Sequence, residues 1–267
     1  MLKQKIVFLL LSFLLLPLGL FSSERVTLIT TLSPCQSYPR TIILEMTQYS
    51  FMRNIPNFID MPKIIVCDGA RNPADIPAYE ALKSRLEKLV LTHPHFKNTT
   101  LVFCKEHKCL VGAVKEALES VKTEYVFLHQ DDFELLVPLD LEGLVDAMDK
   151  NHNIKHVRLN SGVNSLGKSN SFDRLIDDYI EGGCDFPLLR TGGWSDNDHI
   201  ARKDYYEQFV LPKIGDEKTF MEHVMHPAEL EDLAKDKRLH LDYGTYLYGT
   251  FDEGPFIYHL DRKSSVW

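Results

Sequence analysis

Short apolar runs alternate with amphipathic segments over the first two thirds of the chain. β-branched and aromatic runs bounded by turn residues are typical of buried strands, whereas apolar residues three or four positions apart are typical of helices. The expected strands are 26–32, 63–67, 100–104, 124–128 and 154–159, and the expected helices are 41–52, 77–91, 110–121 and 141–148. This alternation predicts an α/β fold with a largely parallel central sheet flanked by helices.

The pattern changes after residue 160. Residues 161–200 are rich in Gly, Ser, Asn and Asp, which predicts long loops over a site rather than core. A helix interrupted at Pro227 is expected over 216–236, followed by β-like runs at 243–250 and 255–260. Because no repeat or linker divides the pattern, we expect a single domain over residues 25–267.

The first 24 residues have the pattern of a targeting segment. Lys3 and Lys5 precede an apolar run that ends near Phe21 and is followed by small residues. The run is shorter than the about 20 residues that span a bilayer comfortably. We expect a signal peptide or, alternatively, an uncleaved signal anchor that gives membrane association. In either case the domain is expected to be exported or lumenal, in the secretory pathway.

The charge balance bears on the class of partner. The chain has 30 Lys and Arg against 38 Asp and Glu, a net charge of −8. A protein that grips nucleic acid usually has a basic surplus, so no nucleic-acid partner is expected. The five cysteines are an odd number, and Cys67 and Cys104 lie inside apolar runs, which favours buried free thiols there.

Polar residues follow three expected strands, at Ser33, Asp68 and the group 129–132. Ligands of parallel sheets bind beyond the carboxyl ends of the strands, so these ends predict a site. In an extended strand, positions two apart point to the same side, which would let His129 and Asp131 share a ligand. Oxygen and imidazole together suit Mn²⁺. The alternative is a solvated acidic turn after a core strand.

Residues 26–133 resemble the nucleotide-binding half of family 2-like glycosyltransferases with the GT-A fold. The runs VTLITTL (26–32) and KIIVCDG (63–69) are similar to the first two strands of that family, and GAVKEAL (112–118) with TEYVFL (123–128) resembles the helix and strand that lead to its DXD motif. The resemblance implies a Rossmann-like mixed sheet, with a nucleotide-binding half over 25–133 and an acceptor half over 134–267. It also implies transfer of a sugar from a UDP- or GDP-sugar to a glycan, lipid or protein hydroxyl, with inversion.

The resemblance also implies a divalent metal, Mn²⁺ or Mg²⁺, held at a DXD-like motif. His129 stands where the family usually has the first Asp, followed by Asp131 and Asp132. Several GT-A enzymes add a late histidine ligand, and His259 is the candidate here. The alternative for His259 is an ordinary surface or core histidine.

The family's catalytic base lies in the acceptor half. Glu222 in TFMEHV (219–224) is the first choice for this base, with Asp196 and Asp198 as competitors. Trp194 follows two glycines and either stacks on a sugar ring or packs in the core. The residues expected to bind the nucleotide sugar are Thr31, Ser33, Asp68, Lys115, Asp131 and Trp194.

The sequence is also compatible with two other functions. A sugar nucleotidyltransferase usually has a Gly-rich basic loop after the first strand, where this chain reads SPCQ (33–36). A catalytically silent carbohydrate-binding or scaffold protein is favoured by His129. The joint presence of Asp131, Asp132, Glu222 and His259 argues against a silent protein.

Overall fold

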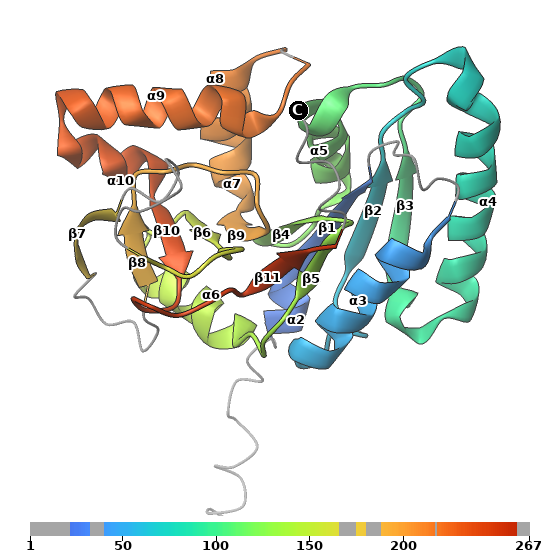
Figure 1. Ribbon diagram of the computed structural model, residues 1–267, viewed down its shortest axis with the longest axis horizontal. Coiled ribbons are helices and arrows are strands. Elements are labelled where there is room, and N and C mark those ends of the chain that lie inside the picture. The colour runs from blue at the N-terminus through green and yellow to red at the C-terminus, as the bar shows by residue number, and fades with distance from the viewer. Residues whose placement is uncertain (1–21, 33–39, 166–174, 180–187, 217, 261–267) are drawn as a thin grey trace, which may run out of the picture.

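A single nine-stranded sheet forms the centre of the molecule (Figure 1). The computed structural model describes residues 22–32, 40–165, 175–179, 188–216 and 218–260. The strand order is β3-β2-β1-β4-β9-β6-β10-β8-β7, and β11 and β5 form a separate two-stranded sheet. Helices cover both faces, which confirms the α/β fold with a mixed central sheet.

The first half of the chain contains the parallel part of the sheet. Here β1 (Val26–Leu32) pairs in parallel with β2 (Lys63–Cys67) and β4 (Tyr125–Gln130), and β2 pairs in parallel with β3 (Thr99–Phe103). The helical elements are α2 (Ser22–Arg25), α3 (Ile42–Asn54), η2 (Pro73–Asp75), α4 (Ile76–Thr92), η3 (Pro94–Phe96) and α5 (Cys109–Ser120). These strands and the three long helices lie where the hydrophobic pattern predicts them, to within two residues.

The second half completes the sheet and adds two helical layers. Its elements are β5 (Phe133–Leu135), α6 (Leu141–Lys150), β6 (His156–Arg158), β7 (Leu175–Tyr179), β8 (Leu188–Thr191), β9 (His199–Arg202), α7 (Lys203–Tyr205), η4 (Tyr206–Val210), α8 (Leu211–Ile214), α9 (Met221–Lys235), η5 (Lys237–Leu239), α10 (His240–Tyr243), β10 (Thr245–Tyr248) and β11 (Ile257–His259). Because β9 pairs with β4, hydrogen bonds join the two halves within one sheet.

Two sequence predictions are wrong in this half. The stretch 161–200, expected as loops, contributes the strands β7 and β8 and the start of β9, which is held by antiparallel pairing with β4 and β6. Pro227 lies inside α9 and does not interrupt it. Pro227 has no N–H, so one hydrogen bond of the helix is missing. Burial of Met221 and Met225 on one side of α9 offsets this loss and keeps the helix continuous.

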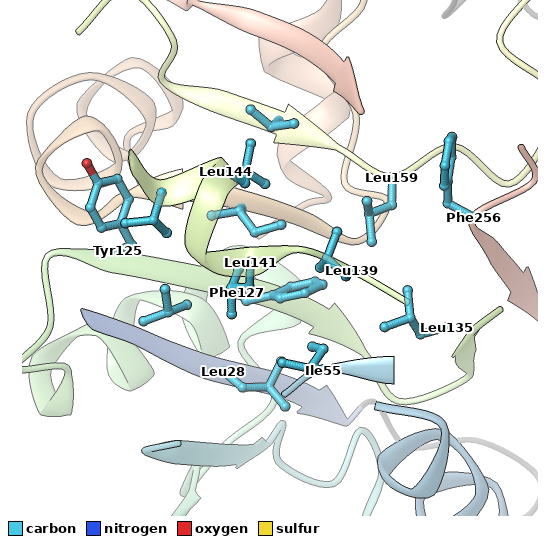
Figure 2. Close-up of a cluster of buried hydrophobic side chains, with 14 of the residues drawn as sticks. Leu28, Ile55, Tyr125, Phe127, Leu135, Leu139, Leu141, Leu144, Leu159 and Phe256 are labelled. Carbon is cyan, nitrogen blue, oxygen red and sulfur yellow. The ribbon is translucent and has the colours of Figure 1, made fainter. Parts of the chain in front are cut away.

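Successive residues of β4 point into different cores, as the pleat requires. Tyr125 and Phe127 face the cluster beneath α3 and α6, whereas Val126 and Leu128 face the cluster beneath α5 and α9. Figure 2 shows part of the first cluster, with Phe127 among side chains of β1 and α6. The odd-numbered positions of β4 therefore point toward α3.

The cysteines in the described part of the chain carry free thiols. Cys67 and Cys104 are buried free thiols, as predicted, and Cys109 is a partly exposed free thiol.

The expected targeting segment falls almost wholly in residues 1–21, outside the described part of the chain. Among the described residues, no helix has both the length and the apolar character needed to cross a membrane.

Candidate functional site at the carboxyl edge of the sheet

The acidic pair Asp131 and Asp132 leaves the sheet at the carboxyl end of β4. Both residues lie in a turn directly after the strand and are partly exposed. The Asp131 amide donates to the Thr31 carbonyl at 3.2 Å, and the Thr47 hydroxyl donates to the Asp131 carbonyl at 3.1 Å. β1 and α3 thus fix the backbone of the turn and leave both carboxylates at the edge of the sheet.

His129 does not join these carboxylates, contrary to the prediction that it is a metal ligand. Its side chain is completely buried, with its ring centroid 4.4 Å from that of Phe51. His129 Nδ1 lies 2.7 Å from Asp198 Oδ2. The pleat of β4 directs the His129 side chain under α3. Because β4 ends at Gln130, Asp131 lies in the turn and its side chain does not follow the direction of His129.

Asp198 is therefore unsuited to the role of catalytic base. It is completely buried, and its second oxygen accepts a hydrogen bond from the Gln130 amide at 3.0 Å. Burial raises the pKa of Asp198, an effect that the neighbouring His129 opposes. An acceptor hydroxyl has no route to a carboxylate enclosed in this way.

Asp132 and His259 are in direct contact, although 127 positions separate them. His259 Nε2 lies 2.7 Å from Asp132 Oδ2, and the two side chains are 27% and 26% exposed. Antiparallel pairing of β11 with β5 sets His259 opposite Phe133, the residue that follows Asp132. The structure therefore brings the late histidine to the acidic pair after β4.

The donors Asp131, Asp132 and His259 fit a divalent cation in kind. Two carboxylates and an imidazole suit Mn²⁺. Within the described ranges, no three His, Cys, Asp or Glu side chains surround a common point. A cation at this edge would have to replace the contact between Asp132 and His259 and take further ligands from its nucleotide.

Glu222 and Asp196 form a second acidic pair, at the amino end of α9. Glu222 Oε2 accepts hydrogen bonds from the Ser195 hydroxyl at 3.0 Å and from the Asp196 amide at 3.2 Å. In return, the Glu222 amide donates to Asp196 Oδ2 at 3.2 Å. Burial, followed by the charge of Glu222, raises the pKa of Asp196 well above its usual value. Two adjacent carboxyl groups, one buried with a raised pKa and one partly exposed, are an arrangement suited to proton transfer.

Gln130 connects the acidic pair to β4. Its side-chain amide donates to the Asp196 carbonyl at 2.9 Å, while its backbone amide binds Asp198. The loop that holds Asp196 is thereby fixed to the strand that precedes Asp131 and Asp132. Sequence reasoning missed this role, because nothing in the sequence marks Gln130 except its place inside the motif.

Trp194 is a core residue, which overturns its expected role as an exposed sugar platform. It is 0% exposed, and its indole N–H donates to the Tyr205 hydroxyl at 3.2 Å. The ring centroid of His156 lies 5.0 Å from that of Trp194. Of the two interpretations that the sequence left open, packing is the correct one.

The other expected nucleotide ligands lie in separate places. Thr31 is buried, and its hydroxyl donates to the His129 carbonyl at 3.3 Å. Lys115 Nζ lies 3.8 Å from Asp216 Oδ1. Both residues line a hollow of about 450 Å³, and neither acidic pair contributes to that lining. Ser33 lies outside the described residues.

Asp68, expected to contact the nucleoside, is only 2% exposed and is turned toward the protein. Its Oδ1 accepts hydrogen bonds from the amides of Gly69 at 2.9 Å and Lys108 at 2.7 Å. Its Oδ2 lies 2.6 Å from His107 Nδ1. In this structure Asp68 therefore orders the loop before α5 and presents no oxygen to solvent.

Neither a protein-family model nor a curated protein matches this sequence. Solved structures match in fold. The mannosyltransferase PcManGT from Pyrobaculum calidifontis, in complex with GDP-Man and Mn²⁺, is 12% identical with a TM-score of 0.55, covering 90% of this chain and 58% of its own. S. aureus TarS 1-349 in complex with UDP-GlcNAc is 12% identical with a TM-score of 0.53, covering 90% and 59%. GalNAc-T7 with UDP, GalNAc and Mn²⁺ is 10% identical with a TM-score of 0.55, covering 91% and 45%.

These likenesses confirm the expected GT-A fold. This chain spans between 45% and 59% of the length of the three solved chains, so it matches one part of each.

Proposed function

We propose that this chain is a metal-dependent glycosyltransferase that moves a sugar from a nucleoside-diphosphate sugar to a hydroxyl group, with inversion. The observation that carries the proposal is the pairing of Asp132 with His259 at the carboxyl edge of a GT-A sheet. A donor with UDP or GDP is favoured, because the solved structures of similar fold hold UDP, UDP-GlcNAc or GDP-Man. A glycan, lipid or protein would supply the hydroxyl.

In this proposal Asp131, Asp132 and His259 hold the cation. A bound divalent metal offsets the negative charge that develops on the departing diphosphate. The chain's own part is to keep Asp131 and Asp132 at the sheet edge, through the contacts of their turn with Thr31 and Thr47. His129, enclosed with Asp198, is left out of the cation site.

Glu222 acts as the base. The acceptor oxygen attacks the anomeric carbon, the bond from that carbon to the diphosphate oxygen breaks, and the acceptor's proton passes to Glu222. Asp196 is a positioning residue, because its carboxyl group accepts a hydrogen bond from the amide of Glu222 and so holds the start of α9.

A ligand panel followed by a turnover assay tests the proposal. The full chain would be melted with UDP, GDP, CMP and their sugars, with and without Mn²⁺, because a ligand that binds only the folded state raises the melting temperature. We expect one nucleotide to stabilise the chain only when Mn²⁺ is present, and its sugar to release nucleoside diphosphate when acceptors are added. Stabilisation by glycans with none by nucleotides would instead indicate the silent carbohydrate-binding protein.

A further inference from the structure

Three side chains at the amino end of α5 and the end of β2 form a line that the proposed transfer reaction does not use. His107 Nδ1 lies 2.6 Å from Asp68 Oδ2, and His107 Nε2 lies 3.4 Å from Cys109 Sγ. Asp68 is buried, His107 is 24% exposed and Cys109 is partly exposed. A carboxylate, an imidazole and a thiol in this order are the arrangement that activates a nucleophilic cysteine.

The carboxylate end of this line is rigid. Asp68 Oδ1 is held by the amides of Gly69 and Lys108, which keeps its other oxygen close to His107. A Cβ on Gly69 would lie 2.3 Å from the Glu106 carbonyl carbon, so the turn after β2 and the loop before α5 touch. Oδ2 lies out of line with the ring N–H of His107, and such contacts are often poorly aligned before a reactant binds.

The thiol end has two features of its own. Cys109 is the first residue of α5, a helix of 12 residues, and a helix amino terminus favours a negative charge. The backbone φ of Cys109 is 58°, in the left-handed region, which residues other than glycine rarely adopt. Strained conformations of this kind cluster at functional positions.

Two lysines near the line have contacts of their own. Lys108 contacts Glu116, and the Lys218 ammonium group donates to the His107 carbonyl at 3.3 Å. Glu106 contributes the neighbouring backbone that meets Gly69. Like the other described His, Cys, Asp and Glu side chains, these three do not surround a common point.

We propose that Cys109 is an activated nucleophilic thiol and a site of covalent modification by soft electrophiles, including peroxides. His107 takes the thiol proton, and the thiolate attacks one peroxide oxygen. An S–O bond forms, the O–O bond breaks, and the departing hydroxide takes the proton from His107 and becomes water. The sulfur is oxidised to a sulfenic acid and the peroxide is reduced.

Two other thiols provide internal controls. Burial raises the pKa of the Cys67 thiol far above its usual range and raises the pKa of Cys104 to about 12. Both residues are 1% exposed, so neither should react while the chain is folded.

Alkylation kinetics test the proposal on the full chain. Iodoacetamide would be added between pH 5.5 and 8.5, and each cysteine peptide would be quantified by mass spectrometry. An ordinary cysteine is only a few per cent thiolate at pH 7, so folded Cys109 should react about tenfold faster than the same residue in urea-unfolded chain. Hydrogen peroxide should convert it to a sulfenic acid that dimedone traps.

His107→Ala should reduce the rate at pH 7 to that of the unfolded chain or below, whereas His152→Ala, at an exposed position, should leave it unchanged. The proposal is overturned if folded Cys109 reacts no faster than unfolded Cys109, or if His107→Ala leaves the rate unchanged. The comparison of folded with unfolded Cys109 in the unmodified sequence decides the question even if that variant does not fold. None of these measurements depends on sugar transfer.

Discussion

His129 and Asp198 form a completely buried pair, with 2.7 Å between Nδ1 and Oδ2. The pair joins the end of β4 to the segment just before β9, and Gln130 adds a backbone hydrogen bond to the same carboxylate. Each side chain is the other's hydrogen-bonding partner in a medium of low polarity, and removal of Asp198 takes away the contact of His129 Nδ1. The contact therefore has a structural role.

Asp198→Ala should lower the free energy of unfolding by about 3–5 kcal/mol, because it strands His129 in the core. Urea unfolding measures the change. The Mn²⁺ affinity of the molecules that remain folded should not change. A variant of His129 that keeps its stability and loses Mn²⁺ binding would show instead that this histidine is a metal ligand.

Glu222→Gln should reduce kcat by about 10²–10⁴-fold with little change in donor KM, since it removes the proposed base and keeps the shape of the side chain. Steady-state kinetics with saturating acceptor measure both constants. Asp196→Asn is the matched control. Its side-chain oxygen can still accept the Glu222 amide, so its effect on kcat should be much smaller. If Asp196→Asn proved the more damaging substitution, the two roles would have to be exchanged.

Glu229 should make the stability of the chain depend on pH. It is a buried residue of α9, accepts a hydrogen bond from the Thr245 hydroxyl, and has its pKa raised by burial to about 7. For a raised pKa, the stabilising contribution is complete below the unfolded value of about 4.3 and is lost as the pH rises through 7. Relative to Glu229→Gln, the unmodified chain should therefore lose roughly 3 kcal/mol of unfolding free energy between pH 4 and pH 8. Urea unfolding of both proteins across this range checks the difference, and parallel pH curves would contradict it.

The sequence predicts the parallel half of the fold well and the second half less well. β1, β2 and β4 are buried on both faces, so each is rich in apolar and β-branched residues without a polar-apolar alternation. β9 has only four residues, two of them charged or polar, and it exists because β4 and β6 pair with it on either side. Such pairing between distant segments leaves no local signal.

The same distinction separates the site residues. The partnership of Asp132 with His259 was anticipated from a family resemblance, since no local pattern links positions so far apart. The strand rule that put His129 beside Asp131 fails because the turn begins at Asp131. Trp194 follows two glycines and suggests an exposed loop, yet Tyr205, from a helical stretch that the pattern did not predict, helps to enclose it.

Nucleotide binding by calorimetry tests the central claim most directly. UDP and GDP would be titrated into the full chain with and without Mn²⁺, and again into the Asp132→Asn and His259→Ala variants, with His152→Ala as an exposed control. We predict that one nucleotide binds only with Mn²⁺, that both site variants weaken this binding by at least about tenfold, and that the control does not. Folded variants that bind Mn²⁺ and the nucleotide as tightly as the unmodified chain would contradict a cation site at Asp132 and His259.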